Sequence, residues 1–199
     1  EGSLRITSVG GVNLTASNDV GTLAADVTQA GSSFRFGDIN ALVVGSVDGV
    51  NGIATNGADV NLIVGGALAV LDSAPGDDVT TDITGGGLVN ANIVYRTDTL
   101  DLVAGSTTRA SAFGTTGFFI WLVPFSNDVD IEIGAGTGVG VLDISAAEIG
   151  TLTSNILRIG YRDGLGYAVF NGPAVLFSPV RVSSDDITVT APIVSPGQL

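Results

Sequence analysis

The chain has 199 residues, seven arginines, no lysine and a formal net charge of −13 at pH 7. This charge argues against binding to a nucleic-acid backbone or to an anionic lipid surface, since both need clustered cations. Cysteine and histidine are absent, which excludes disulfides and thiolate metal sites and removes the commonest general base. No run approaches the ~18 apolar residues of a membrane span, so membrane insertion is not expected.

The composition favours strands and corners over helices. Glycine, with 29 residues, is about twice its usual share of ~7% and lacks the period-three spacing of collagen. Charged residues make up only 14%, against ~25% in a typical domain, so Thr, Ser, Asn and Asp must supply most of the polar surface. Aspartate, a turn former, outnumbers glutamate by 17 to 3. With 45% hydrophobic residues, the chain can bury a core as one domain spanning 1–199.

Short strands separated by glycine corners are predicted through the amino-terminal part. Apolar residues recur at every second position in most of them, which is the pattern of a half-buried strand. Gly10-Gly11 marks the first corner, and Asp48-Gly49 and Asn51-Gly52 are strong turn dipeptides. The predicted strands lie at residues 4–6, 12–14, 23–27, 33–36 and 40–47.

Residues 57–71 are the stretch around which we expect the fold to be organised. Val60, Leu62 and Val64 alternate along one strand, and Gly65-Gly66 then allows the backbone to turn where a Cβ would obstruct it. A second strand follows directly. Variants of this strand-and-corner unit recur along the chain, and repetition of one such unit is typical of a solenoid.

The rest of the chain continues the strands, with one irregular part. We expect an excursion from the regular coil at about 106–126, which includes an apolar run at 118–125. Strict alternation returns at 128–134, and residues 191–199 are predicted to be a frayed tail. The other predicted strands lie at 79–83, 89–95, 100–102, 141–144, 157–160 and 187–190.

Helix signals are poor, and the best of them lies at 143–152. Ser145-Ala146-Ala147-Glu148 has the spacing of a capping box, in which both side chains accept backbone N–H groups. Gly150 and the β-branched neighbours oppose a helix here. The fold is therefore expected to be all-β.

Similar strands recur at intervals of roughly 18 to 30 residues, which predicts a parallel β-helix, or β-solenoid, with two or three strands per coil. The rival is an antiparallel β-sandwich, whose strands recur every ~8–12 residues. A sandwich would join paired strands by Asn-Gly or Asp-Gly hairpins, and Gly-Gly and Gly-Ala corners outnumber such turns here. The recurring strands are marked by Val12, Phe34, Val60, Leu100, Val129, Leu157 and Ile187.

Several runs resemble the repeats of large filamentous-haemagglutinin-like exoproteins. They are residues 18–25, 45–53, 58–68, 147–160 and 186–193, whereas residues 72–130 match less well. The resemblance implies a right-handed parallel β-helix, secretion to the bacterial surface and service as an adhesin shaft or matrix fibre. Because no catalytic residues come with the family pattern, none is carried over to this chain.

Asp128, Asp130 and Glu132 place three carboxylates on one face of a predicted strand, ~7 Å apart. Oxygen ligands of this kind suit Ca²⁺. The Gly-Gly-x-Gly-x-Asp calcium repeat is missing, however, so a solvated outer face is favoured over a metal site and no cofactor is expected. Asp77-Asp78 and Asp185-Asp186 fit turns or strand edges better than acid pairs.

The apolar run at 118–125, Phe-Phe-Ile-Trp-Leu-Val-Pro-Phe, has two interpretations. It fills the core or caps an end of the solenoid, or its outward half forms an exposed patch for a partner or a neighbouring copy. The candidate interaction residues are Phe118, Phe119, Trp121 and Phe125.

We expect a structural, non-catalytic role, as part of a bacterial surface adhesin or an extracellular fibre. The fibre would assemble through strand edges or through the aromatic patch, with further copies, a longer parent chain, or a host or surface glycan as partner. Glu1-Gly2-Ser3 is not a natural start, so a mature product or a piece of a longer protein is expected.

The alternative function is a β-helix polysaccharide lyase or hydrolase, or a carbohydrate-binding module. Arg158 and Arg162, near Asp163, are the candidate patch for it. A surface ion pair, which contributes about 0–1 kcal/mol, explains the same three residues.

Overall fold

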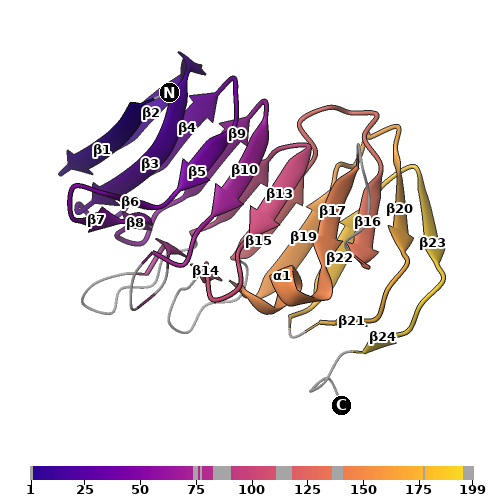
Figure 1. Ribbon diagram of the computed structural model, residues 1–199. Coiled ribbons are helices and arrows are strands. Elements are labelled where there is room, and N and C mark those ends of the chain that lie inside the picture. Colours follow the sequence, from indigo (N-terminus) through magenta and orange to yellow (C-terminus); the bar gives the residue numbers. More distant parts are fainter. Residues whose placement is uncertain are drawn as a thin grey trace.

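The computed structural model describes residues 2–73, 76, 78–82, 91–110, 118–135, 141–176 and 178–194. In this part of the chain, all strand pairs but one are parallel, which confirms the predicted parallel β-helix and excludes the antiparallel sandwich. The chain descends along the front layer of Figure 1, rises along the back layer, and returns one strand further to the right. This path is a right-handed coil.

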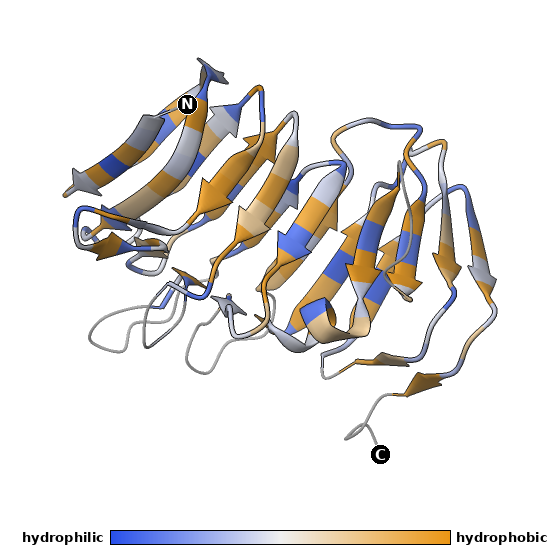
Figure 2. Ribbon diagram, viewed as in Figure 1, coloured by the Kyte–Doolittle hydropathy of each residue, from blue (hydrophilic) through white to orange (hydrophobic). Residues whose placement is uncertain are grey.

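The front layer, called face 1, holds nine strands in spatial order along the coil axis (Figure 1). Their inward residues are apolar, and orange and blue bands alternate along many of the strands in Figure 2. The strands are β1 (Gly2–Ser8), β3 (Val20–Val27), β5 (Leu42–Val44), β10 (Ala67–Val70), β13 (Thr99–Leu102), β17 (Leu142–Ser145), β16 (Ile131–Gly134), β20 (Tyr167–Phe170) and β23 (Asp186–Val189).

The back layer, called face 2, is one seven-stranded sheet in unbroken chain order. Its strands are β2 (Val12–Asn18), β4 (Phe34–Asp38), β9 (Val60–Val64), β12 (Ile93–Arg96), β15 (Phe119–Val123), β19 (Ile156–Gly160) and β22 (Val180–Ser183).

A third, shorter side lies along the bottom of Figure 1. It joins face 1 through β3, whose first half pairs with β5 and whose second half pairs with a third-side strand. Its strands are β8 (Ile53–Thr55), β11 (Val79–Thr80), β14 (Thr108–Arg109), β18 (Leu152–Thr153), β21 (Ala174–Val175) and β24 (Ile193–Val194).

The core is built from columns of equivalent residues on successive coils of face 2. The parallel register aligns each inward side chain with the one above and below it, and burial of each contributes roughly 1.5–3 kcal/mol. One column is Val12, Phe34, Val60, Ile93, Ile120, Leu157 and Val180. The next is Leu14, Phe36, Leu62, Tyr95, Leu122, Ile159 and Val182.

The Gly65-Gly66 corner is one of the places where neighbouring coils approach closely. A Cβ on Gly66 would lie 2.6 Å from backbone atoms of Asn40 and Ala41, and one on Gly65 would lie 2.7 Å from the Ile39 carbonyl oxygen. Neither glycine is among the residues with positive φ. The corner therefore needs glycine for the contact between coils more than for an unusual backbone angle.

The one antiparallel pair is a small hairpin, β6 (Ser46–Val47) with β7 (Val50–Asn51). Its central residues are the predicted turn dipeptide, and both have positive φ, 46° for Asp48 and 83° for Gly49. A two-residue hairpin turn requires this conformation.

The helix suggested by the capping-box spacing forms as a single short element, α1 (Ala146–Gly150). Ser145 Oγ accepts a hydrogen bond from Glu148 N at 3.2 Å, and Glu148 Oε2 accepts one from Ser145 N at 2.8 Å. The other oxygen, Glu148 Oε1, accepts a hydrogen bond from Leu102 N at 3.0 Å and so ties the helix to β13. The helix therefore forms even though Gly150 and the β-branched neighbours oppose it, and it is shorter than the candidate segment 143–152.

On face 1 one strand lies out of chain order. β17 lies beside β13, while β16, which precedes β17 in the chain, lies between β17 and β20 (Figure 1). The coil that contains β16, β17 and β19 therefore contributes two strands to face 1 and one strand, β19, to face 2. The two swapped strands have the same alternation, because Ile131 and Ile133 align with Leu142 and Ile144, and all four side chains are buried.

The stretch 106–126, predicted as an excursion, contains two strands of the coil. β14 continues the third side, and β15 continues face 2 because Ile120 and Leu122 fit the core columns. Residues 111–117 lie outside the described residues. In the predicted tail, β24 pairs with β21, and residues 195–199 lie outside the described residues.

Candidate functional site

The aromatic run divides between the core and the outer surface of face 2. Phe118 is buried with Ile120 and Leu122, so it takes no part in a surface patch. Phe119 and Trp121 point outward and are partly exposed, and Phe125, beyond the strand, is 39% exposed. The outward half of the run is thus available for contact.

The corner before β15 determines which residues of the run point outward. Asp59 Oδ1 accepts a hydrogen bond from Asn92 N at 2.8 Å, and Asn92 Oδ1 accepts one from Phe119 N at 3.1 Å. These bonds link three successive coils at the same corner and anchor the first residue of β15. From that position alternation carries Trp121 to the outer surface.

The register of face 2 places arginines beside the tryptophan. Trp121 pairs with Arg158, and Arg158 pairs with Arg181. The Arg158 guanidinium carbon lies 3.7 Å from the centroid of the Phe119 ring, a cation–π contact. Its Nε is buried and makes no hydrogen bond within the described residues.

Trp121 is held in a fixed orientation. Its Nε1 donates a hydrogen bond to the carbonyl oxygen of Gly160 at 2.7 Å. The ring meets Phe119 edge-on, with centroids 6.4 Å apart, and lies nearly parallel to Tyr161, at 9° and 6.5 Å between centroids. Gly160 has φ 86°, and a Cβ there would lie 2.1 Å from the Ser183 carbonyl oxygen, so only glycine fits this position.

Trp121 and Arg158 line a groove of about 450 Å³, which we call the arginine–aromatic groove, and Phe119 and Tyr161 contact Trp121 beside it. Its lining includes Trp121, Arg158, Gly160, Arg162, Arg181 and Ser183. No Asp or Glu lines it, and among the described residues none of its three arginines makes an ion pair. The groove therefore concentrates positive charge on a chain whose net charge is −13.

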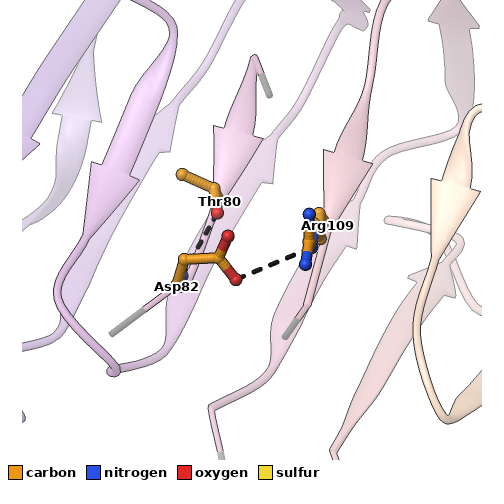
Figure 3. A network of polar contacts seen from close by, with 3 residues as sticks. All are labelled: Thr80, Asp82 and Arg109. Atoms are coloured by element: carbon orange, nitrogen blue, oxygen red, sulfur yellow. Dashed lines mark hydrogen bonds and ion pairs between the residues drawn. The ribbon is translucent and has the colours of Figure 1, made fainter. Parts of the chain in front are cut away.

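The arginine on the third side makes an instructive contrast. Arg109 Nε lies 3.7 Å from Asp82 Oδ1, and Asp82 N donates a hydrogen bond to Thr80 Oγ1 at 3.1 Å (Figure 3). Both charged side chains are about 40% exposed, so this pair is a surface ion pair of small energetic value. The guanidinium groups of the groove have no such partner among the residues that the structure describes.

A second groove of about 320 Å³ lies on face 2 between the β2–β4 pair and Phe125. Its one carboxylate, Asp38, is 4% exposed and accepts hydrogen bonds from Val20 N and Asn40 N, both at 2.9 Å. This acid stabilises the backbone of two coils, so the second groove offers less chemistry than the first.

The three candidate calcium ligands do not converge. Asp128 is exposed before the strand, and Glu132 lies on the outward side of β16. Asp130 Oδ1 accepts a hydrogen bond from Tyr167 N at 3.1 Å, and its carboxylate raises the pKa of the Tyr167 hydroxyl by hydrogen bonding. Within the described residues, no three acidic side chains are arranged to hold a metal ion.

The paired aspartates differ from one another in position. Asp78 is 1% exposed, and its carboxylate accepts hydrogen bonds from Ser73 N at 2.7 Å and Thr107 N at 2.9 Å, which is a structural role between coils. Asp77 lies outside the described residues, and Asp185 and Asp186 are exposed near the last strand of face 1.

Sequence reasoning identified Arg158, Arg162 and most of the aromatic residues but missed Arg181 and Tyr161. A signal for Arg181 is present in the sequence, because Val180-Arg181-Val182 repeats the pattern of Leu157-Arg158-Ile159 one coil later. Tyr161 follows the strand directly, and no pattern marks it.

Comparison with known proteins assigns no family. A scan against protein-family models finds no match, and searches of curated proteins and of solved structures return no significant match. Among the described residues, no helix has the length and apolar character needed to cross a membrane. The role of the groove must be argued from its own chemistry.

Proposed function

We propose that the chain is a structural, non-catalytic β-solenoid that forms part of an extracellular adhesin or fibre. The observation that carries the proposal is that, among the described residues, apolar side chains at inward positions of the first and last strands are only partly covered. Aliphatic side chains and unpaired strand edges at both ends of a coil favour the addition of further strands.

At the amino-terminal end, β1 and β2 each pair on one side only within the part of the chain that the structure describes. Leu14 is 39% exposed, whereas its neighbour in the column, Phe36, is fully buried. The first coil thus leaves partly exposed the kind of apolar surface that each inner coil buries against its neighbour.

At the carboxyl-terminal end, β23 pairs with β20 and with no other strand of the described residues. Ile187 is 46% exposed and Val189 is 55% exposed, although both occupy inward positions next to Ala168 and Phe170. Because β1 and β23 run in the same direction, β23 of one copy can pair in parallel with β1 of the next. Repetition of this head-to-tail contact adds copies in a line without closing into a ring, and such an open assembly is a fibre.

The bacterial surface location belongs to the same proposal, and its support is the sequence resemblance to filamentous-haemagglutinin-like repeats. A polysaccharide lyase or hydrolase is the alternative. A hydrolase commonly uses two carboxyl groups ~5–9.5 Å apart, and no carboxylate lines the arginine–aromatic groove. The residues of this groove favour binding over cleavage.

The fibre is tested by sedimentation and by electron microscopy of the 199-residue chain over a range of concentrations. We expect the apparent mass to rise with concentration and filaments to appear. Ile187→Lys should prevent this assembly, because it places a charge where an added coil would bury an aliphatic side chain. Thr188→Lys is the matched control, since Thr188 lies on the opposite side of β23 and pairs with outward Val169.

Both lysine variants reduce the net negative charge by the same amount. A difference in assembly between them therefore cannot come from the change in overall charge. Circular dichroism checks that each variant keeps its β structure. A wild-type chain that stays monomeric at every concentration would contradict the proposal, and so would equal loss of assembly in both variants.

A further inference from the structure

The arginine–aromatic groove brings positive charge to one place on a strongly acidic chain. Arg35, Arg96, Arg158 and Arg181 all occupy outward positions of face 2, and Arg162 follows β19. Within the described residues, the outward positions of these strands carry no carboxylate. Three of the five arginines line the groove, so it is the place on face 2 where an anionic group meets the most donors.

The arginines of the groove are arranged to receive an anion. Arg158 is held over the Phe119 ring, so its guanidinium position is set before a ligand arrives. Arg162 and Arg181 are exposed and have no ion-pair partner among the described residues. A guanidinium presents paired N–H donors that match the two oxygens of a carboxylate or a sulfate.

The aromatic side chains supply a flat apolar surface beside these donors. The only polar atom of the Trp121 ring is bonded to Gly160 O, so the exposed part of the indole can make only apolar contacts. Tyr161, 40% exposed, lies nearly parallel to it. A sugar ring has one apolar face that packs on such rings, while its hydroxyl groups remain available for hydrogen bonds.

We infer that the arginine–aromatic groove binds a saccharide that carries a single acidic group, with a sugar ring on Trp121 and the acid between the arginines. A volume of about 450 Å³ suits two or three sugar rings. The net charge of −13 opposes a uniformly charged polymer such as a nucleic acid, which needs cations along its whole length. The site is independent of the strand edges used in fibre assembly.

The chain contains one tryptophan, so its fluorescence reports directly on this groove. The probes are lactose, sialyllactose, which adds one carboxylated sugar, and lactose 3′-sulfate, which adds one sulfate. We expect the emission to change on titration with an acidic saccharide and to stay unchanged with lactose. Binding of sialyllactose alone, of the sulfate alone, or of both supports the inference and identifies the acidic group.

Three arginine variants remove the same charge from exposed positions of face 2. Arg162→Ala and Arg181→Ala should each weaken binding about tenfold or more, because each removes charge-assisted hydrogen bonds. Arg35→Ala should change the affinity less than about twofold, since Arg35 lies outside the groove. Calorimetry with each variant provides a readout that does not depend on fluorescence.

Four results would overturn the inference. They are no response to either acidic saccharide at millimolar concentration, equal binding of lactose, equal loss of affinity in Arg35→Ala, and binding of a single-stranded oligonucleotide in place of the saccharides. None of these results depends on whether the chain assembles into fibres, so the two proposals can fail separately.

Discussion

The hydroxyl groups of Tyr95 and Thr108 lie 3.0 Å apart and share a hydrogen bond inside the coil. Tyr95 belongs to the core column of face 2, and Thr108 belongs to β14 on the third side. Tyr95 is fully buried and Thr108 is 1% exposed, so neither hydroxyl has access to water. The bond joins two sides of the coil through an otherwise aliphatic interior.

Removal of both partners should destabilise the fold less than the two single removals added together. Tyr95→Phe leaves the Thr108 hydroxyl buried without its tyrosine partner, which costs about 1–3 kcal/mol. Thr108→Val should have a similar effect, and the double variant should lose less than the two single losses together. Urea unfolding of the four proteins measures the coupling. Strictly additive losses would show that the bond contributes nothing beyond the separate side chains.

Stability should fall in alkaline solution because of the same tyrosine. Burial raises the pKa of Tyr95 above its ordinary value of ~10. Below pH ~10 the hydroxyl is neutral in both folded and unfolded chains, and its contribution is fully present. Above that pH the unfolded chain ionises while folded Tyr95 keeps its proton, so stability falls by up to about 1.4 kcal/mol per pH unit.

Urea unfolding between pH 8 and pH 11 tests this dependence, with Tyr95→Phe as the comparison. The variant should lose stability less steeply above pH 10, since it has no buried phenol. Identical slopes in the two proteins would mean that other groups cause the alkaline loss.

Two glycine corners provide a matched pair of substitutions. Gly66→Ala would bring a Cβ to 2.6 Å from the Asn40–Ala41 backbone, so two coils must separate, and we expect a loss of about 1–3 kcal/mol. Gly10→Ala meets no atom within 4 Å and should change stability by less than about 0.5 kcal/mol. Thermal unfolding compares them. Equal losses would show that the contact between coils is not what makes Gly66→Ala costly.

Much of the coil could be predicted from the sequence because local chemistry determines it. Alternation marked Val60, Leu62 and Val64 as inward, Asp48-Gly49 specified its turn, and the spacing of Ser145 and Glu148 specified a helix start. In each case the residues that form the sequence pattern also make the contact that fixes the local structure. Of the recurring positions, Val12, Phe34, Val60 and Leu157 share one core column, whereas Leu100 and Ile187 belong to face 1.

The candidate site could be predicted only in part, because its geometry depends on residues far away in the chain. In the run 118–125 both alternating sets are apolar, so alternation does not show which set faces inward. The corner bond from Phe119 N to Asn92 makes that choice. The meeting of Trp121 with Arg158 and Arg181 depends on the number of residues in each coil, and no local pattern encodes it.

The reversed order of β16 and β17 affects how the molecule can form. In a solenoid each new coil can dock on the one before it as soon as it has been made. Here β16 emerges before β17, yet its final neighbours are β17 and β20, which both come later in the chain. Its own alternation, Ile131 and Ile133, would also fit the place beside β13 that β17 finally holds.

Addition of one coil after another from the amino terminus therefore cannot proceed in simple order through this coil. A nascent chain that ends near residue 135 must leave β16 unpaired or place it in a position from which β17 later displaces it. We therefore expect β16, β17 and β20 to acquire their native order together, whereas the other coils of the molecule can be added one at a time.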